Sequence, residues 1–372
     1  MNIFYYYPLK DTIMGHWPNA HFIDELSRHR IQMHIFNPLL YKSWDEANDR
    51  AIKEIKEGEF DLFFTSECES PVLSMNIFSE IKKMGIPSMC LRFDNLVIPL
   101  YDKEMAPLFD LVWLTSIETK RFYDKWGAKT CFAPYAANPY TFKFIEKPCI
   151  NRACFVGTPY GSRARLFNTL LQNNVDLTLY FGHSCDDTTN EWEHYDTYIA
   201  VPLKSKKEEI FNRLKFKEGR IMLKGALKNK LMGKCQVEQS EHLEIKPAVA
   251  PIELSNIYSE YALSIASTSV HHTDVLKNPL KIINLRNFEI PMSGGVELCK
   301  YNPELANYYE EDKEILFYRS NEELVEKAIY YSTKASESEL KAIRIAARSR
   351  SEKDHTWMNR FAIMFKELGL KY

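Results

Sequence analysis

Residues 152–182 read RACFVGTPYGSRARLFNTLLQNNVDLTLYFG, and this stretch decides the fold class. Its two ends, 152–159 and 176–182, are short apolar runs typical of strands, and 163–174 between them has helical character. A strand, a helix and a second strand in succession predict a βαβ unit with parallel strands. The segment before it, 138–150, contains two prolines and no clear period, which indicates a linker.

The same alternation occurs on both sides of that linker. Further strands are predicted at 2–7, 32–36, 61–66, 87–93, 110–116, 129–135, 261–267, 281–283, 296–299 and 314–320, and helices at 45–58 and 117–127. The strand runs are apolar throughout, as expected for parallel strands covered on both faces. We therefore predict an α/β protein with two Rossmann-like domains, 1–145 and 150–350, facing across a cleft. Ligands of such sheets bind beyond the carboxyl ends of the strands.

Composition limits the function classes. The chain has 372 residues, 45% of them hydrophobic, which is enough for two cores, and a formal charge of −2, which argues against a nucleic-acid binder. Its eight cysteines are scattered without a CxxC pair, as expected for free thiols in a reducing compartment. We see no signal peptide and no apolar run long enough to span a membrane. The expectation is a cytoplasmic protein.

A basic insert interrupts the alternation at about 183–242. Residues 204–234 contain eleven Lys or Arg against three Glu, with apolar residues interleaved. One interpretation is a basic amphipathic hairpin that contacts an anionic membrane at its inner face, or an anionic acceptor. The other is a solvated helical insert whose charges keep it soluble. The chain then ends in helical segments from 321 to 369, the last with an apolar stripe that must pack on something.

The stretch LRNFEIPMSGG, residues 285–295, holds the strongest candidate for a ligand site. We expect a short helix that is capped by Asn284, follows the strand 281–283 and ends at Gly294 and Gly295. Its N-terminus would then lie at the carboxyl edge of the second sheet, where free N–H groups suit a diphosphate. Glu289, one turn in, could accept hydrogen bonds from both hydroxyls of a ribose.

Other motifs are weaker. The chain has no P-loop, GxGxxG, HExxH or DxD motif, and the nearest acidic triplet is ECE at 67–69, after a predicted strand. That triplet suits either a site at the strand end or a solvated loop. His271 and His272 are adjacent, so on a strand they would point to opposite sides, and we expect no metal site.

Several segments in order resemble the spore maturation protein CgeB-like glycosyltransferases, which are related to glycosyltransferase family 4. They are 155–182, the LRNFEIPMSGG signature, 301–332 and 355–361, and segments within residues 1–145 resemble the acceptor-side domain of that family. The resemblance implies the two-domain GT-B architecture, with a C-terminal helix, 352–372, packing on the N-terminal domain. It also implies transfer of a sugar from a nucleotide-diphosphate sugar, without a further cofactor, to a glycan, glycolipid or protein in bacterial cell-surface synthesis.

The resemblance assigns roles to single residues. Glu289 would hold the donor ribose and Arg286 would lie beside the diphosphate, within a signature that also includes Phe288, Gly294 and Gly295. Arg163 and Gly157 would lie on a phosphate-facing loop. Lys281 stands where family 4 enzymes have a first glutamate, which leaves open whether the anomeric configuration is retained or inverted. Lys281 could neutralise the leaving diphosphate or be a simple lysine at the sheet edge.

Catalytic residues and rival functions stay open at this point. Asp94 and His16, each after a strand of the first domain, are candidates for acid–base catalysis or ordinary hydrogen-bonding groups. A GT-B epimerase or phosphorylase would share the cleft. A non-catalytic glycan-binding protein on the same fold is the remaining alternative, although it would have no use for a carboxylate placed like Glu289.

Overall fold

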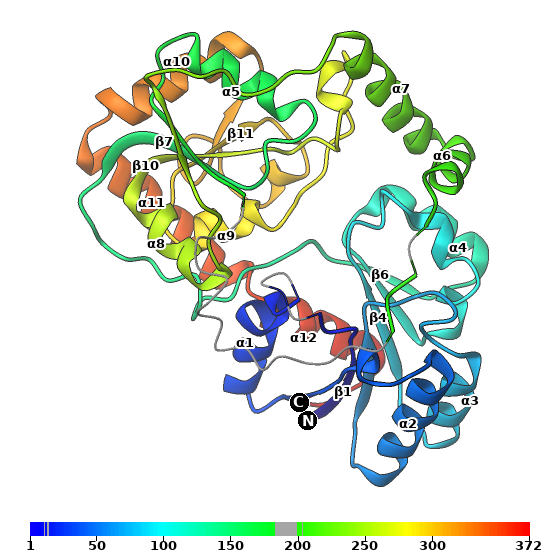
Figure 1. The fold of residues 1–372 in the computed structure, drawn as a ribbon. Helices are drawn as coiled ribbons and strands as arrows, with labels where there is room; N and C mark the ends of the chain where they lie inside the picture. Colours follow the sequence, from blue (N-terminus) through cyan, green and yellow to red (C-terminus); the bar gives the residue numbers. More distant parts are fainter. Residues whose placement is uncertain (11, 13–14, 183–198, 203) are drawn as a thin grey trace. The chain divides into compact units, whose positions relative to one another are not determined.

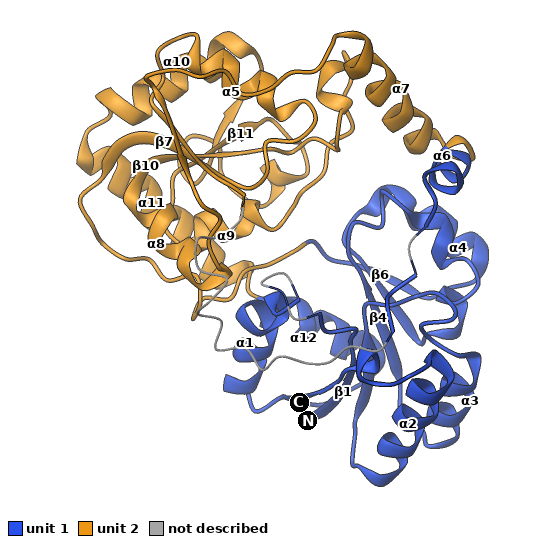
Figure 2. Cartoon of the chain, in the orientation of Figure 1, with its two compact units in different colours: residues 1–134, 191–213, 357–372 blue, residues 135–190, 214–356 orange. Residues whose placement is uncertain are grey.

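The computed structural model describes all residues except 11, 13–14, 183–198 and 203, and it divides the chain into two compact units (Figures 1 and 2). Unit 1 comprises residues 1–134, the described residues of 191–213, and 357–372. Unit 2 comprises 135–182 and 214–356 among the described residues. Each unit contains one six-stranded sheet.

Unit 1 is built on a parallel sheet with strand order β2-β1-β3-β4-β5-β6. Its strands are β1 (Asn2–Tyr6), β2 (Gln32–Phe36), β3 (Leu62–Thr65), β4 (Ser88–Arg92), β5 (Leu111–Leu114) and β6 (Thr130–Phe132). Every strand predicted in this part of the chain is present. The central strands β3 and β5 are buried along their whole length, which explains why their sequences are apolar without alternation.

The helices of unit 1 cover both faces of this sheet. They are α1 (Asp24–Arg28), α2 (Trp44–Glu57), α3 (Met75–Lys83), α4 (Lys120–Trp126) and α12 (Trp357–Leu368), with α6 (Lys206–Leu214) extending to the boundary of the unit. Helix α2 begins where it does because the Ser43 hydroxyl accepts a hydrogen bond from the backbone N–H of Glu46, as in a capping box.

The C-terminal helix α12 belongs to unit 1, although the helix before it belongs to unit 2. Trp357 and Phe361 are fully buried among aromatic side chains that include Phe22 and Trp113. The backbone N–H groups of Trp357 and Met358 donate to the carboxylate of Glu25, so the first turn of α12 is capped by a side chain from α1.

Unit 2 is built on a second parallel sheet with strand order β12-β11-β10-β7-β8-β9. Its strands are β7 (Ile150–Val156), β8 (Leu177–Tyr180), β9 (Leu243–Lys246), β10 (Tyr261–Ala266), β11 (Glu297–Lys300) and β12 (Leu316–Tyr318). Its helices are α5 (Arg163–Leu171), α7 (Lys217–Leu231), α8 (Leu254–Glu260), α9 (Arg286–Met292), α10 (Asn321–Ile329) and α11 (Glu337–Asp354).

Two details of unit 2 differ from the prediction. Residues 281–283 are not a strand of the sheet, because they pair with the loop after β10: the N–H of Ile282 donates to the carbonyl of Thr268, and Lys281 forms an isolated antiparallel bridge with Ser269. In contrast, β9 forms directly after the predicted insert, where no strand was predicted, and pairs with β8. Three apolar residues are too few to indicate a strand by themselves.

The segment predicted as a linker is held by unit 2. The Arg348 guanidinium donates to the carbonyl oxygens of Pro139 and Phe142, and the N–H of Ile145 donates to the Ser259 hydroxyl. The structure therefore divides the chain after residue 134 and not near 145. Part of the predicted insert, 183–198 and 203, lies outside the described residues, and α6 and α7 make up most of the rest.

Candidate functional site

The predicted phosphate-facing residues meet at the end of β7. Gly157 follows the strand with a φ of 130°, and a Cβ at this position would collide with the Arg286 guanidinium. Arg286, the first residue of α9, donates from Nε to the carbonyl of Val156 at 2.6 Å and lies over the Phe155 ring at 5.4 Å. A glycine is required here because the arginine side chain occupies the space of a side chain at 157.

Arg163 brings a second guanidinium to the same place. It is the first residue of α5, donates to the carbonyl of Thr158 at 3.1 Å and lies over the ring of Tyr160 at 4.2 Å. Burial and the positive charge of Arg286 lower its pKa. Within the described part of the chain, neither arginine forms an ion pair with a carboxylate. Two adjacent guanidinium groups that are not ion-paired form a candidate site for a polyanion.

A pocket of about 190 Å³ adjoins Arg163 in unit 2. Three of its lining hydroxyl groups follow β10, its cations come from α5 and from the end of β11, and Asp274 adds one carboxylate. These residues include Ser267, Thr268, Ser269, Arg163, Arg165 and Lys300. The pocket therefore lies beyond the carboxyl ends of the strands, where open α/β sheets bind ligands. It combines hydroxyl groups with positive charge and suits a polar anionic ligand.

Glu289 lies one turn into α9 and is nearly buried. Its neighbourhood is defined by Tyr258 on α8, whose pKa is raised by burial and then by the negative charge of Glu289, while Arg286 opposes the shift. The Tyr258 hydroxyl is buried and has no hydrogen-bond partner among the described residues. Arg286, Glu289 and the Tyr258 hydroxyl thus form one polar group within a largely apolar interior.

Glu297 is a further carboxyl of this group that the sequence analysis missed. It is the first residue of β11, is fully buried and accepts a hydrogen bond from Asn287 Nδ2 at 2.5 Å. Burial raises its pKa to about 8, and the nearby charge of Glu289 adds to the shift. Its sequence context, VELC, indicates only a strand. The sequence did contain one signal for this residue, because a charged residue inside a strand that is predicted to be buried is unusual.

Three residues of the LRNFEIPMSGG signature have packing roles. Phe288 is fully buried against Tyr308, Tyr309 and His355, so the structure does not place it at a ligand surface as predicted. A Cβ at Gly294 would collide with the Phe144 ring, and a Cβ at Gly295 would lie 3.0 Å from the carbonyl oxygen of Tyr258. The two glycines allow α9 to pack closely against its neighbours.

Lys281 lies among other cations. Its Nζ is 5.2 Å from the centre of the Tyr301 ring, and burial together with the charges of Lys300 and Arg319 lowers its pKa. Lys281 therefore lies near Tyr301, Lys300 and Arg319, which are not the residues around the Arg163 and Arg286 guanidinium groups. Since 281–283 is not a strand, the interpretation of Lys281 as a sheet-edge lysine was wrong, and its role at a diphosphate stays a prediction.

The two acid–base candidates lie in unit 1. Asp94, two residues after β4, is exposed and has a φ of 49°, and its carbonyl accepts from the N–H of Val97. His16, in the loop after β1, is buried. His271 and His272 lie in unit 2, where His272 packs against Gly161 and contacts Asn229. Within the described residues, no group of three His, Cys, Asp or Glu side chains is placed to hold a metal.

Comparison with known proteins supports the fold. Residues 207–366 match the model of a family described as glycosyl transferase-like. No curated protein sequence matches. Solved structures, glycosyltransferases among them, match over almost the whole chain.

The first of these is an α-glucosyltransferase in complex with UDP and a 13-mer DNA containing an HMU base, with a TM-score of 0.59, 11% identity and 99% of both chains covered. Sucrose-phosphate synthase from Thermosynechococcus elongatus has a TM-score of 0.56, 11% identity and 99% coverage of both chains. HepE of Anabaena, in complex with UDP and glucose, has a TM-score of 0.55 and 11% identity, with 98% of this chain and 99% of HepE covered.

The predicted fold class is confirmed. Two six-stranded parallel sheets with flanking helices match the GT-B architecture of these proteins. The chain therefore has the GT-B fold of nucleotide-sugar glycosyltransferases. Its C-terminal part, 207–366, is also glycosyl transferase-like in sequence.

Proposed function

We propose that the protein is a glycosyltransferase that moves a sugar, of hexose type, from a nucleotide-diphosphate sugar to a glycan, glycolipid or protein acceptor. The observation that carries the proposal is the pair of guanidinium groups at the carboxyl end of β7, with Arg286 against Gly157 and Arg163 hydrogen-bonded to Thr158. The glycosyl transferase-like match and the GT-B fold support it. A CgeB-like role in bacterial cell-surface glycan synthesis is the finer form of the same proposal.

The described residues suit separate parts of such a donor. Arg163 and Arg286 would bind the diphosphate and stabilise the negative charge that develops on it as the sugar leaves. Glu289 would accept hydrogen bonds from the ribose hydroxyls, next to the unpartnered Tyr258 hydroxyl. The pocket beside Arg163 would hold a further part of the nucleotide. We propose no cofactor besides the donor, because the two arginines already supply positive charge at the leaving group.

UDP is the first nucleotide to test. The HepE and α-glucosyltransferase structures are described as complexes with UDP. An epimerase is the second candidate, because a structure described as a putative UDP-N-acetylglucosamine 2-epimerase from Listeria monocytogenes matches with a TM-score of 0.50 and 8% identity. An epimerase needs no acceptor, so release of free UDP with formation of a glycoside distinguishes the transferase from it.

The test is thermal stabilisation by a panel of nucleoside diphosphates and nucleotide sugars, with Glu289→Ala beside the wild type. A nucleotide at about 100 times its dissociation constant should stabilise the folded wild type by ~2.7 kcal/mol. We expect one base to raise the melting temperature and Glu289→Ala to lose most of that increase, because the alanine cannot bind the ribose hydroxyls. Glu260→Ala, a change in the neighbouring helix, is the control. A wild type that no nucleotide stabilises contradicts the proposal.

We further propose that the protein is cytoplasmic and attaches peripherally to an anionic membrane through α7. No helix in the described residues is long and apolar enough to cross a bilayer. One face of α7 packs on residues 272–275 through Gly225. Large apolar side chains outside that face, Leu227, Leu231 and Met232, are exposed at 50–79%. Exposed lysines, among them Lys224 and Lys230, lie between them. Apolar side chains flanked by cations are typical of helices that lie on anionic bilayers.

Sedimentation with lipid vesicles tests the attachment. We expect the wild type to bind phosphatidylglycerol vesicles and not phosphatidylcholine vesicles. Lys224→Gln combined with Lys230→Gln should weaken that binding about 30-fold, since each lysine near an anionic surface contributes ~1 kcal/mol. Lys53→Gln with Lys83→Gln, two exposed lysines of unit 1, is the charge-matched control. Equal binding to both kinds of vesicle, or none to either, contradicts the attachment.

A further inference from the structure

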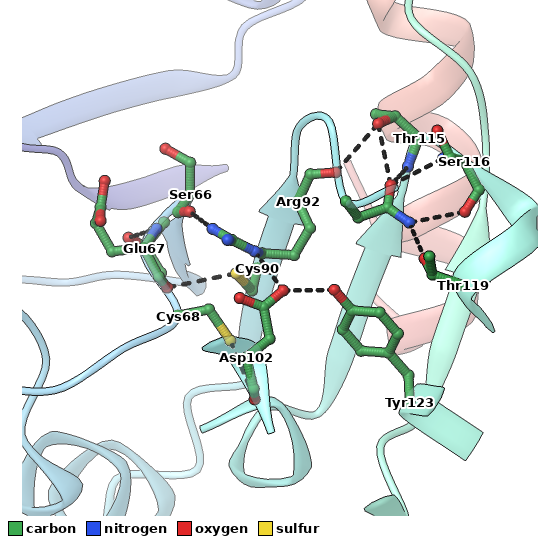
Figure 3. Close-up of polar contacts among 12 residues, drawn as sticks. Ser66, Glu67, Cys68, Cys90, Arg92, Asp102, Thr115, Ser116, Thr119 and Tyr123 are labelled. Atoms are coloured by element: carbon green, nitrogen blue, oxygen red, sulfur yellow. Dashed lines mark hydrogen bonds and ion pairs between the residues drawn. The ribbon is translucent and has the colours of Figure 1, made fainter. Parts of the chain in front are cut away.

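The loop after β3 in unit 1 holds Glu67 in a fixed position (Figure 3). The N–H of Glu67 donates to Thr65 Oγ1 at 3.0 Å, and its carbonyl accepts from Cys90 Sγ at 3.4 Å. Thr65 Oγ1 in turn donates to the carbonyl of Tyr6 at 2.8 Å. The backbone of Glu67 is therefore tied to all three neighbouring strands, β1, β3 and β4.

The buried ion pair between Arg92 and Asp102 also holds this loop in place. Arg92 Nε donates to Asp102 Oδ2 at 2.8 Å, and its Nη1 donates to the carbonyl of Ser66, the residue before Glu67 (Figure 3). The Tyr123 hydroxyl donates to the same Asp102 oxygen. Burial alone would lower the pKa of Arg92, but Asp102 raises it above its ordinary value, while burial raises the pKa of Asp102 against the opposing effect of Arg92. Such a network is stable only when its members are hydrogen-bonded, and it restricts the loop to one conformation.

The Glu67 carboxylate itself has no hydrogen-bond partner in the described part of the chain, although its backbone is so well held. Burial raises its pKa, opposed by the charges of Arg92 and Lys10. Tyr5 and Tyr7 stand beside it with stacked rings 5.0 Å apart, and both interact electrostatically with it. The Tyr5 hydroxyl is fully buried and also lacks a hydrogen bond of ordinary geometry among the described residues. Polar atoms left unsatisfied in a fixed setting point to a ligand.

Further aromatic side chains lie beside Glu67, Tyr5 and Tyr7. Trp17 lies beside the Tyr7 hydroxyl, whose rise in pKa it opposes, and its ring meets that of Phe93 edge to face at 4.9 Å. All three side chains of the group are partly exposed. Glu67 follows β3, Phe93 follows β4, and Trp17 lies in the segment between β1 and β2. We refer to Glu67, Tyr7, Trp17 and Phe93 as the Glu67 site.

The charges around the Glu67 site are nearly balanced. Glu69 is paired with Lys204 at 2.6 Å, and Asp102 is paired with Arg92. Among the described residues this leaves Glu67, the exposed Lys10, and the exposed Asp94 that follows Phe93. A phosphate or an acidic peptide would gain little there and would be repelled by the carboxylates. A neutral ligand with many hydroxyl groups can instead donate to the carboxylate and lay its apolar face on aromatic rings.

We propose that the Glu67 site binds a saccharide, with the Glu67 carboxylate accepting hydrogen bonds from two of its hydroxyls and Trp17 and Phe93 covering its C–H face. The identification of this saccharide as the acceptor rests on the proposed function, whereas the binding itself does not. The site replaces Asp94 and His16 as the centre of recognition in unit 1, and it makes a glycan or glycolipid acceptor a better fit than an unmodified protein.

Saturation-transfer NMR with the full chain tests the proposal, with the methyl glycosides of glucose, galactose and N-acetylglucosamine as probes. We expect at least one of them to receive saturation from the wild type. Glu67→Gln should weaken that binding at least ~10-fold, since hydrogen bonds to a charged group contribute most of the polar affinity. Trp17→Leu should weaken it independently, and Glu69→Gln, the matched carboxamide change two residues away, should leave it within about twofold. Melting temperatures show that each variant is folded.

The outcomes distinguish saccharide binding at the Glu67 site from binding at the proposed donor site. Binding that is lost in Glu67→Gln, while stabilisation by UDP is unchanged, supports the proposal. A sugar signal that persists in Glu67→Gln and Trp17→Leu overturns it, and so does a signal lost in Glu289→Ala, which would belong to unit 2. Absence of binding by all three glycosides also overturns it. If a glycoside binds but no nucleotide does, the Glu67 site stands and the proposed transferase function fails.

Discussion

Replacing Arg163 and Arg286 together by glutamine is expected to lower the affinity for UDP about 1,000-fold, while the affinity for uridine changes little. Each guanidinium would make charge-assisted hydrogen bonds to the diphosphate, and such bonds contribute about 1.5–3 kcal/mol apiece. The nucleoside lacks the diphosphate and would bind through the pocket and Glu289. Isothermal titration calorimetry with UDP, UMP and uridine measures the two effects separately.

The free protein gives a second readout for the same change. The two arginines repel each other, and this repulsion adds to burial in lowering the pKa of Arg163. Substituting Arg163 should therefore leave the free protein about as stable as before, whereas substituting Arg286 also removes its hydrogen bond to Val156. The control is Arg319→Gln, because Arg319 is engaged with Glu311 in an ion pair elsewhere in unit 2. Equal losses for UDP and uridine would show that the arginines support the fold of the pocket and do not bind phosphate.

Glu297→Gln is expected to remove most of a fall in stability between about pH 4.5 and pH 8. In the folded protein the pKa of Glu297 is raised to about 8 from an ordinary value of 4.5, chiefly by burial. Within this window the folded state holds a proton that the unfolded state releases. Stability is therefore greatest below the unfolded pKa and declines as pH rises toward the folded one, by ~4 kcal/mol. Glutamine resembles the protonated acid and does not titrate.

Urea unfolding at intervals from pH 4.5 to 8.5 measures this dependence for the wild type and the variant. Glu314→Gln is the control, since that carboxylate is also nearly buried but is paired with Arg350. It should lower stability while the wild-type decline with pH persists. Identical pH profiles for the wild type and Glu297→Gln would mean that Glu297 is hydrated or ionised in the folded protein.

Some residues of the proposed donor site could be predicted from the sequence, whereas the roles of others could not. Glu289 could be named from its place one turn into a short helix after an apolar run, whereas Arg163, Gly157 and Arg286 were named from the resemblance to a glycosyltransferase family. Phe288, Gly294 and Gly295 belong to the same signature, yet in the structure they pack against other residues of unit 2. A linear motif does not distinguish residues that bind a ligand from those that hold the binding residues in place.

Local periodicity predicted the strands of unit 1 and most of those of unit 2, because a strand buried on both faces must be apolar along its length. The segment 281–283 shows the limit, since a three-residue apolar run pairs equally well with a loop or with a sheet. Strand β9 shows the converse, because its residues are only partly buried and form a strand by pairing with β8.

The sequence by itself determined the α/β class and the two-sheet organisation, since these follow from short-range patterns of apolar and polar residues, and its resemblance to a family indicated the glycosyltransferase-like signature. Only the tertiary structure decided which side chains share a site. It placed the Arg163 guanidinium beside that of Arg286, 123 positions later, and the Glu67 carboxylate beside Tyr7. The physical reason is that the charge, burial and hydrogen bonding of a side chain depend on neighbours from distant segments, which local pattern does not specify.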